Sequence, residues 1–293
     1  FPAASGTYPS GTDVAAYLES YADTFNLPVE LDQPVRHLRQ TGDGFAVETA
    51  ASSWGARRVV VATGAFGRPW RPWAAGLDGV HQLHASEYRT PNDVPSDDVL
   101  VVGAGNTGVQ LALELARSGR TVQLSGEPGG RFITQRPLGK DLFWWLDVTG
   151  AIRAPDTTLV GRRLRANDPI IGSTKRMLRT AGVRWAPRVA AQSGAEVTFA
   201  DGTKRAPGTV LWATGYRHDD RWVEIPEALD ELGALRTQGL RTPVAGLFVI
   251  GRPWQRNRGS ALLGFVGDDA QVLAEMLSEP VPAPRRTGAE LGA

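Results

Sequence analysis

The clearest pattern of apolar and polar positions lies between residues 98 and 125. Residues 99–102 form an uninterrupted apolar run, as expected for a strand of a parallel sheet that is buried on both faces. A glycine-rich loop follows, and Gly119 ends the segment after it. The apolar residues of that segment recur at helical spacing, at Val109, Ala112, Leu113, Leu115 and Ala116. A second short strand is expected at 121–124, so the pattern predicts a strand–loop–helix–strand unit of an α/β protein.

Shorter elements flank this unit. Ser10 followed by Asp13 is typical of a helix start, and the apolar stripe of that helix comprises Val14, Tyr17, Leu18, Tyr21 and Phe25. Alternating residues predict a hairpin over 35–49. Short apolar strands run into glycine turns within 59–64, 209–215 and 246–251. A stretch rich in Pro, Trp and Gly at 67–95 is typical of a connector between domains.

Composition removes several classes of function. The formal net charge of +1 gives no electrostatic reason to expect a nucleic acid or an anionic membrane as a partner. The absence of cysteine excludes disulfides, thiolate nucleophiles and Cys-ligated metals within this chain. No apolar stretch approaches the ~20 residues of a membrane span, and residues 1–5 do not resemble a signal peptide. We expect a cytoplasmic protein.

The glycine-rich loop Gly103-Ala104-Gly105-Asn106-Thr107-Gly108, which we call the phosphate loop, follows the GxGxxG pattern. Between a predicted strand and a predicted helix, this pattern is typical of dinucleotide binding. Gly103 permits the tight turn, Gly105 lets the backbone approach a pyrophosphate, and Gly108 lets helix and strand pack closely. We predict a nucleotide site with Asn106 and Thr107 at the phosphates. A glycine turn without a ligand is the alternative.

The end of the second strand decides between NADH and NADPH. An acidic residue there would bind the ribose hydroxyls and repel a 2′-phosphate. Ser125 and Gly126 occupy this place, and Glu127, which follows them, is an objection to NADPH. The loop nevertheless has several arginines nearby, namely Arg120, Arg131 and Arg136. We predict NADPH, and NADH stays open.

Several motifs give the chain a family resemblance. Two strands end in similar turns, Ala62-Thr63-Gly64 (the first ATG turn) and Ala213-Thr214-Gly215 (the second ATG turn). With the phosphate loop, they resemble the group B flavin-containing monooxygenases, including YUCCA-like enzymes and CzcO-like bacterial flavoproteins. Residues 83–89 keep His84 and Tyr88 of a family fingerprint, and residues 251–268 resemble its C-terminal flavin-contacting segment.

The resemblance implies an α/β fold of two nested Rossmann-like dinucleotide-binding domains in three layers. It divides the chain into a partial FAD-binding domain with small antiparallel strands and a connector (1–97), an NADPH-binding domain (98–216), and a return to the FAD domain with a C-terminal helix and a disordered tail (217–293). Together with the phosphate loop and the end of the second strand, it predicts the following cofactor-binding residues: Ala62, Thr63, Gly64, Gly103, Gly105, Asn106, Thr107, Gly108, Ser125, Arg131, Ala213, Thr214, Gly215, Gly251, Gly267 and Asp268.

The activity that the resemblance implies is FAD-dependent and uses NADPH. One oxygen atom from O2 enters a small organic substrate through a peroxyflavin. The cofactor carries out the chemistry, so we predict no catalytic acid, base or nucleophile. No metal is expected, and neither the substrate nor the oligomeric state is predicted.

One family feature is missing, because nothing before residue 30 supplies an FAD-binding GxGxxG loop. We therefore predict an FAD domain that is incomplete at its N-terminus, as in a truncated chain. A degenerate NADP-binding protein without FAD activity is an alternative. A second alternative is a pyridine-nucleotide reductase, which is disfavoured because its dithiol needs cysteines.

Some side chains have competing interpretations. His84 and Tyr88 are predicted to link the domains, whereas a metal pair of His81 and His84 is disfavoured. Trp144 and Trp145 are predicted to lie in the core or, less favoured, along a substrate channel. Arg252, Arg256 and Arg258 are candidates for flavin phosphate or substrate contact, with solvation as the alternative, and Asp268 could be only a helix cap.

Overall fold

The structure is a computed structural model that describes residues 8–42, 44–72 and 76–279. The disordered tail predicted from residue 280 lies outside the described residues. The described helices are α1 (Gly11–Thr24), α2 (Asn106–Arg117), α3 (Leu142–Val148), α4 (Leu159–Ala166), α5 (Lys175–Thr180) and α6 (Val266–Ser278), with 3-10 turns η2 (Pro91–Asp93), η3 (Pro137–Gly139), η4 (Ala151–Arg153), η5 (Pro226–Ala228) and η6 (Arg258–Ala261). No helix among them is long and apolar enough to span a membrane.

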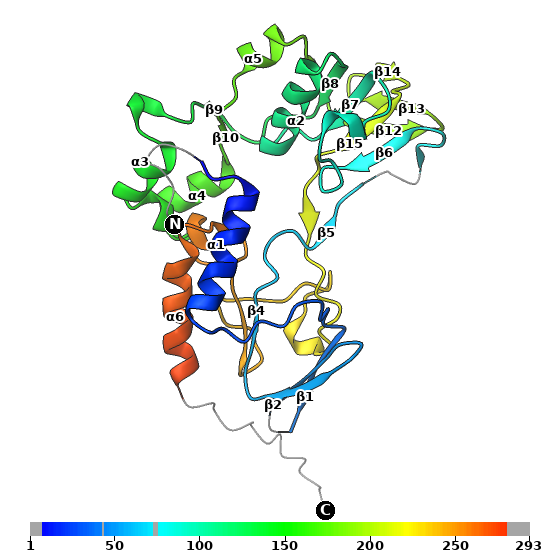
Figure 1. The fold of residues 1–293 in the computed structure, drawn as a ribbon. Helices are drawn as coiled ribbons and strands as arrows, with labels where there is room; N and C mark the ends of the chain where they lie inside the picture. The colour runs from blue at the N-terminus through cyan, green and yellow to red at the C-terminus, as the bar shows by residue number, and fades with distance from the viewer. Residues whose placement is uncertain (1–7, 43, 73–75, 280–293) are drawn as a thin grey trace, which may run out of the picture.

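A five-stranded parallel sheet forms one half of the molecule (Figure 1). Its strands, in spatial order, are β11 (Arg184–Ala186), β8 (Thr121–Ser125), β7 (Asp98–Val102), β15 (Thr209–Trp212) and β6 (His81–His84). The strand–loop–helix–strand unit predicted from the sequence is confirmed as β7, α2 and β8.

Successive side chains along the strands of this sheet point to opposite faces, where they pack into two separate hydrophobic cores. Val99, Val101 and Leu211 face the helical layer of α2 and α5. Leu100 and Trp212 face the opposite way, toward a small antiparallel sheet. That sheet consists of β12 (Val189–Ser193), β13 (Glu196–Phe199) and β14 (Lys204–Arg205). The half therefore has three layers.

The edge strand β6 was not predicted. It pairs in parallel with β15, with Leu83 opposite Leu211, although it lies in the stretch 67–95 that we interpreted as a connector. Only Leu83 and His84 of its four residues are buried. An edge strand with one apolar residue carries little hydrophobic pattern, so the parallel sheet begins well before residue 98.

The other half is built around two parallel strands, β4 (Val59–Val61) and β17 (Leu247–Val249). An antiparallel sheet of β1 (His37–Thr41), β2 (Gly44–Glu48) and β3 (Ser53–Ala56) packs beside them, which confirms the predicted hairpin. Leu38, Phe45, Val61, Val223 and Leu247 lie in the shared core.

Two strands cross between the halves side by side. β5 (Arg68–Pro69) leads into the parallel-sheet half and β16 (Tyr216–Arg217) leads out of it, and they pair antiparallel (Figure 1). The Trp70 N–H donates to the Gly215 carbonyl at 3.0 Å, and the Arg217 guanidinium lies 3.2 Å from the centre of the Trp70 ring. We call this element the crossing.

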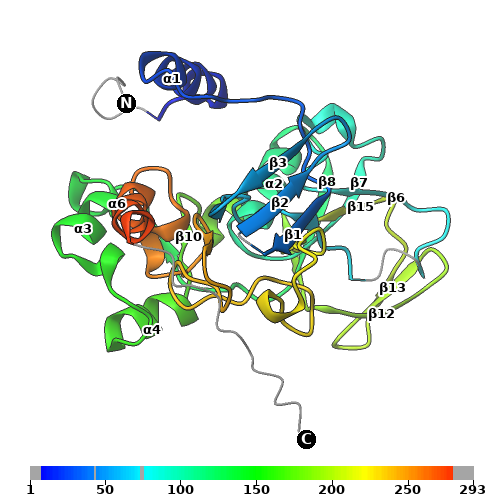
Figure 2. The same cartoon turned by 90° about the horizontal axis from the view of Figure 1, so that it is seen from below.

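The segment 141–168, which contains α3, η4 and α4, lies apart from the parallel sheet and beside α6 (Figures 1 and 2). It leaves that half through two short parallel strands, β9 (Phe132–Ile133) and β10 (Ile170–Ile171). Arg153 pairs with Asp268 at 2.6 Å, and Arg258 pairs with Asp168 at 2.8 Å. Residues 141–168, which we assigned to the NADPH-binding domain, therefore contact the C-terminal segment of the chain.

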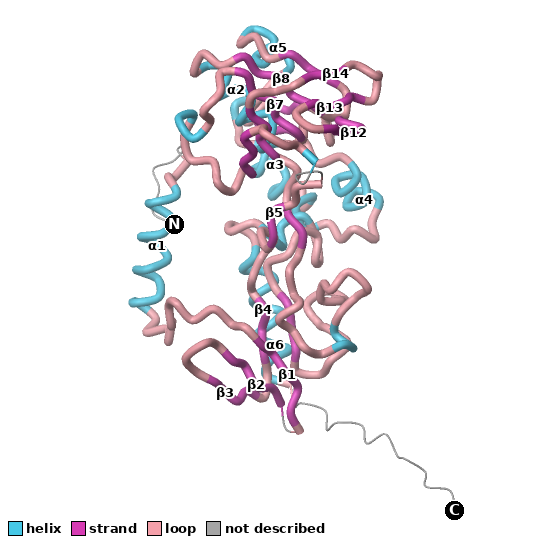
Figure 3. The backbone as a smooth tube through the Cα atoms, turned by 90° about the vertical axis from the view of Figure 1, so that its right-hand side faces the viewer, coloured by secondary structure: helices cyan, strands magenta, loops and turns pink. Residues whose placement is uncertain are grey.

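Helix α1 stands out from the body (Figure 3). Its capping box of Ser10 and Asp13 is present as predicted. Its apolar stripe, however, faces no core, since no residue of α1 is buried and Phe25 is 60% exposed. Tyr21 and Phe25 pack against one another in a tilted arrangement, with ring centres 4.7 Å apart.

Candidate functional site

The phosphate loop joins β7 to α2 as the sequence predicted. The helix begins at Asn106 with Gly105 as its N-cap, and no side chain caps it. The first N–H groups of a helix have no partner within the helix, so these groups are available to an anion at the positive end of the helix dipole. Gly105 and Thr107 are exposed at this end.

The three glycines of the loop have different surroundings. A Cβ on Gly108 would lie 1.8 Å from the Gly103 carbonyl oxygen, and a Cβ on Gly103 would lie 2.3 Å from the Ala213 carbonyl oxygen. A Cβ on Gly105 would meet nothing within 4 Å. Gly103 and Gly108 are therefore required by packing, whereas the space beside Gly105 is open and can receive a pyrophosphate. The residues present fit the phosphates of NADPH.

The second ATG turn lies directly against the phosphate loop. The Ala213 N–H donates to the Val102 carbonyl at 2.8 Å, and Thr214 donates its hydroxyl to the Trp70 carbonyl in the crossing. Gly215 has a φ of +79°, and a Cβ there would meet nothing within 4 Å. The turn therefore connects the phosphate loop to the crossing.

The residues considered for the choice between NADH and NADPH lie near the end of β8, and only some of them are exposed. Ser125 was predicted to contact the cofactor, but its hydroxyl is buried and donates to the Pro187 carbonyl at 2.7 Å. Arg120 donates to the Val94 carbonyl. Arg136 lies beside Tyr8 and Asp141. Burial opposes ionisation of Asp141, but its hydrogen bond with Tyr8, followed by other hydrogen bonds and the nearby Arg136 charge, lowers its pKa. Arg131 and Glu127 are exposed.

Asn106 was predicted to bind the cofactor, and its side chain is engaged within the protein. Its Nδ2 donates to the Pro169 carbonyl at 2.8 Å, and its Oδ1 accepts from the Ile171 N–H at 2.8 Å. Both polar atoms of the amide are thus used within the protein. Only the backbone of Asn106 remains for the phosphates.

The carboxyl ends of β4 and β17 test whether the chain fits FAD. Ligands of open α/β sheets bind outside these ends. Gly64 and Gly251 follow the two strands with φ of +69° and +84°, and a Cβ on either would meet nothing within 4 Å. Gly267, in the first turn of α6, is equally open. These positions fit one end of a flavin cofactor. The described residues contain one strand–glycine loop–helix unit, at 103–108, so they supply no second loop of that kind for FAD.

Asp268 does not cap α6, whose N-cap is Phe265. Its carboxylate binds Arg153 instead. Arg252 contacts neither solvent nor an open site, because it is 5% exposed and its Nη2 lies 2.7 Å from Asp220. Asp220 also accepts from the Leu235 N–H at 2.8 Å. The buried pair fixes the backbone that follows Gly251.

His84 is the last residue of β6, and its ring contacts the second ATG turn. It is 1% exposed, and its Nε2 lies 3.0 Å from the Gly215 carbonyl oxygen. The Ser86 N–H donates to Nδ1 at 3.1 Å, so the ring is neutral with its proton on Nε2. Burial lowers the pKa of His84. His81 is exposed, and residues three apart on a strand point to opposite faces, so the two histidines do not form a metal pair.

Tyr88, predicted to link the domains, lies within the core of the parallel-sheet half, and the two tryptophans of α3 lie outside any core. Tyr88 packs in the core beneath α2, and its burial, followed by the charge of Glu114, raises the pKa of its hydroxyl to about 12. The core position predicted for Trp144 and Trp145 is wrong, because no residue of α3 is buried and Trp144 is 44% exposed. The less favoured prediction, that Trp144 and Trp145 line a substrate channel, stays a prediction.

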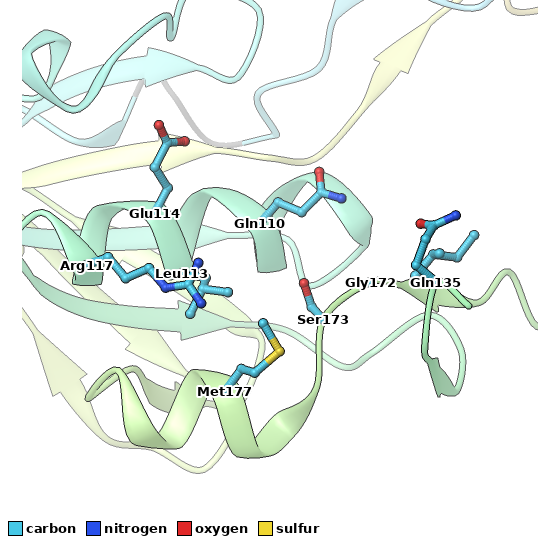
Figure 4. A pocket seen from close by; sticks show the side chains of 9 residues that line it. Gln110, Leu113, Glu114, Arg117, Gln135, Gly172, Ser173 and Met177 are labelled. Atoms are coloured by element: carbon cyan, nitrogen blue, oxygen red, sulfur yellow. The ribbon is translucent and has the colours of Figure 1, made fainter. Parts of the chain in front are cut away.

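A cavity of about 370 Å³ lies along α2 next to the phosphate loop. Figure 4 shows Gln110 and Glu114 of α2 on one side of it, with Ser173 and Met177 on another. None of the cofactor residues predicted from the sequence lines this cavity. Its wall at Ile171 belongs to the segment that Asn106 holds.

Comparison with known proteins places this geometry in a family. Residues 2–135 match the family model described as pyridine nucleotide-disulphide oxidoreductase. A protein of Geobacillus kaustophilus described as an uncharacterized CzcO-like oxidoreductase is 38% identical over 91% of this chain and 77% of its own length. The chain belongs to the CzcO-like oxidoreductases.

Flavin monooxygenases are similar over most of the chain. The structure of a flavin-containing monooxygenase from Stenotrophomonas maltophilia superposes with a TM-score of 0.74 and 28% identity, covering 94% of this chain and 79% of that one. An indole-3-pyruvate monooxygenase from rice is 25% identical over 91% of this chain and 72% of its own length. These relatives establish a flavin-dependent oxidoreductase, and the family implies FAD and NADPH as cofactors.

The glycines of the phosphate loop provide a direct test of the nucleotide site. Gly105→Ala introduces a methyl group into open space at an ordinary φ of −78°. We expect NADP+ affinity to fall by about tenfold or more, which is roughly 1.4 kcal/mol, with no change in melting temperature. Titration calorimetry and thermal unfolding measure the two effects.

Gly108→Ala is the matched control in the same loop. Its Cβ would overlap the Gly103 carbonyl oxygen, so this variant should lose thermal stability as well as affinity. Unchanged NADP+ affinity in Gly105→Ala would mean that the nucleotide does not lie at this loop.

His84 makes stability depend on pH. Its pKa is lower in the folded protein than the ordinary 6.5, so the unfolded chain takes up the proton first as pH falls. The stabilisation is therefore complete above pH 6.5 and decreases as pH falls below it. His84→Gln keeps a donor for Gly215 and cannot titrate in this range.

Denaturant unfolding at pH 7.5 and pH 5.5 should thus show a larger loss of stability in the wild type than in His84→Gln. His218, whose pKa burial also lowers, contributes the same background to both proteins. Equal losses in the two proteins would contradict the role assigned to His84.

Proposed function

We propose that this protein is a flavin-dependent monooxygenase that takes a hydride from NADPH and transfers one oxygen atom of O2 to a small organic substrate. The other oxygen atom leaves as water, with two electrons from NADPH and one proton from solvent balancing the reaction. The observation that carries the proposal is the position of the phosphate loop, whose Gly103 touches Ala213 immediately before the crossing.

The crossing supports transfer between two cofactors. The second ATG turn ends where β16 begins, and the first ATG turn lies four residues before β5. Since β5 pairs with β16, both turns approach the same point from opposite halves. A nicotinamide that extends from the phosphate loop and a flavin at the ends of β4 and β17 would meet there. FAD, when bound, supplies the redox and oxygen chemistry.

The chain's own residues would hold this arrangement. The N-terminus of α2 binds the pyrophosphate, and His84 together with the Trp70 N–H fixes the Gly215 carbonyl. Phe66 packs edge-on against Tyr216 at 5.0 Å beside the crossing.

The reductase alternative has no support in the residues. Its dithiol requires cysteines, and this chain has none. We propose NADPH over NADH on the exposed Arg131, with Glu127 as the opposing feature. The cytoplasmic location expected from the sequence stays a prediction.

A second candidate is a protein that binds NADP without FAD activity. One observation favours it, namely that the described residues contain a single strand–glycine loop–helix unit. Retention of flavin distinguishes the two candidates, because this second candidate would not hold FAD.

The test supplies FAD, NADPH and 18O2 with a panel of sulfides, amines and ketones. We expect a flavin that stays with the protein through gel filtration and a product that contains one 18O atom. Colourless protein would favour the second candidate. Oxidation of NADPH that yields hydrogen peroxide with every substrate, and no labelled product, would contradict the monooxygenase and indicate an oxidase.

A further inference from the structure

Asn106 connects the phosphate loop to a distant part of the chain. Its amide holds Pro169 and Ile171, 63 and 65 residues further along, by two hydrogen bonds of 2.8 Å. An asparagine at the first position of the helix could direct its side chain to the ligand. Here the donor and the acceptor of the amide both bond to backbone groups, so the side chain holds a protein segment in place and does not contact a ligand.

The segment held by Asn106 is in turn bonded to the loop that follows β8. The Ile170 N–H donates to the Arg131 carbonyl at 3.0 Å, and the Gly172 N–H donates to the Ile133 carbonyl at 3.0 Å. Ile170 is 1% exposed and packs in the core of the parallel-sheet half. The short pair of β9 and β10 is therefore anchored and not a loose surface ribbon.

A second contact fixes the same loop. A Cβ on Gly130 would lie 2.2 Å from the Asp168 carbonyl oxygen, so the backbone at Gly130 lies against residue 168. The 127–131 loop is thus held at Gly130 and Arg131 by residues 168–170. Residues 169 and 171 are held by Asn106, which completes a path from the phosphate loop to Arg131.

We propose that Asn106 is a positioning residue that sets the preference for NADPH over NADH, by fixing the 127–131 loop relative to the phosphate loop. The inference rests on the proposed use of NADPH. The pyrophosphate is held at Gly105, and the 2′-phosphate lies on the adenosine ribose next to it. A cation can favour that phosphate only if its distance from the pyrophosphate site is fixed.

Arg131 is the cation that this geometry favours. Arg120 is bonded to the Val94 carbonyl and to Ser118, and Arg136 lies beside Asp141. Arg131 is exposed, and its backbone is the point at which β10 holds the loop. We call the hydrogen bonds from Asn106 to residues 169 and 171 the clamp. NADH lacks the 2′-phosphate, so loss of the clamp should weaken the binding of NADPH and leave the binding of NADH unchanged.

The test measures dissociation constants of NADP+ and NAD+ by titration calorimetry, which needs no turnover. In Asn106→Ala we expect NADP+ to bind about tenfold more weakly, a change of the size expected for one charge-assisted contact with a phosphate, while the constant for NAD+ changes less than about twofold. Asn167→Ala removes an exposed amide that donates to Arg163, and it should change neither constant.

Arg131→Ala shows whether Asn106 acts through this arginine. It should remove most of the preference for NADP+, and adding Asn106→Ala to it should have no further effect on the ratio of the two constants. Additive effects would mean that Asn106 acts elsewhere and would overturn the proposal.

Gly130→Ala keeps the test decisive if Asn106→Ala folds poorly. Its methyl group would displace the 127–131 loop from Asp168 without touching the phosphate loop. The variant should therefore weaken the binding of NADP+ and leave that of NAD+ unchanged. If the Asn106 and Gly130 variants weaken both nucleotides equally, the clamp is merely structural and the inference fails, although the proposed function stands. A wild type that binds neither nucleotide would instead contradict the proposed function.

Discussion

Backbone contact between the phosphate loop and the second ATG turn determines where the nucleotide can lie. Gly103 approaches Ala213, and Gly108 approaches Gly103, at distances that leave no room for a Cβ. The loop is thereby pressed against the strand end that leads into the crossing. A larger residue at either position would separate the helix from the turn and move the phosphates away from the other half of the molecule.

The remaining contacts around the site preserve that geometry. The neutral ring of His84 and the Trp70 N–H converge on the Gly215 carbonyl, and the buried pair of Arg252 and Asp220 fixes the backbone after β17. Removing one partner of such a buried pair typically costs about 3–5 kcal/mol. The ion pairs of Arg153 are about half exposed and contribute less, so they orient the 141–168 arm more than they stabilise the fold.

The sequence predicted the elements whose signal is local. Four consecutive apolar residues and the GxGxxG pattern were sufficient for β7, the phosphate loop and α2, and Ser10 with Asp13 predicted the start of α1. Contacts between distant segments carry no local signal. The edge strand β6 has a single apolar residue, and the apolar residues of α3 are at most half-buried because it lies on an arm away from the parallel sheet.

Side-chain roles were predicted less well than loop positions, for the same reason. Ser125 and Asn106 occupy the expected places at the end of β8 and the start of α2, but their polar atoms are bonded to Pro187 and to Pro169 and Ile171. These partners are more than 60 residues away, and no spacing rule identifies them. The structure thus assigns Asn106 to organising the site, while backbone N–H groups of α2 remain for the phosphates.

The central claim is that a nicotinamide held by the phosphate loop reduces a flavin across the crossing. Anaerobic mixing of the flavin-loaded protein with NADPH, followed by flavin absorbance, tests it most directly. We expect that stoichiometric NADPH bleaches the flavin and that admitted O2 restores its absorbance. A protein that retains its flavin but keeps the oxidised spectrum in excess NADPH would contradict it.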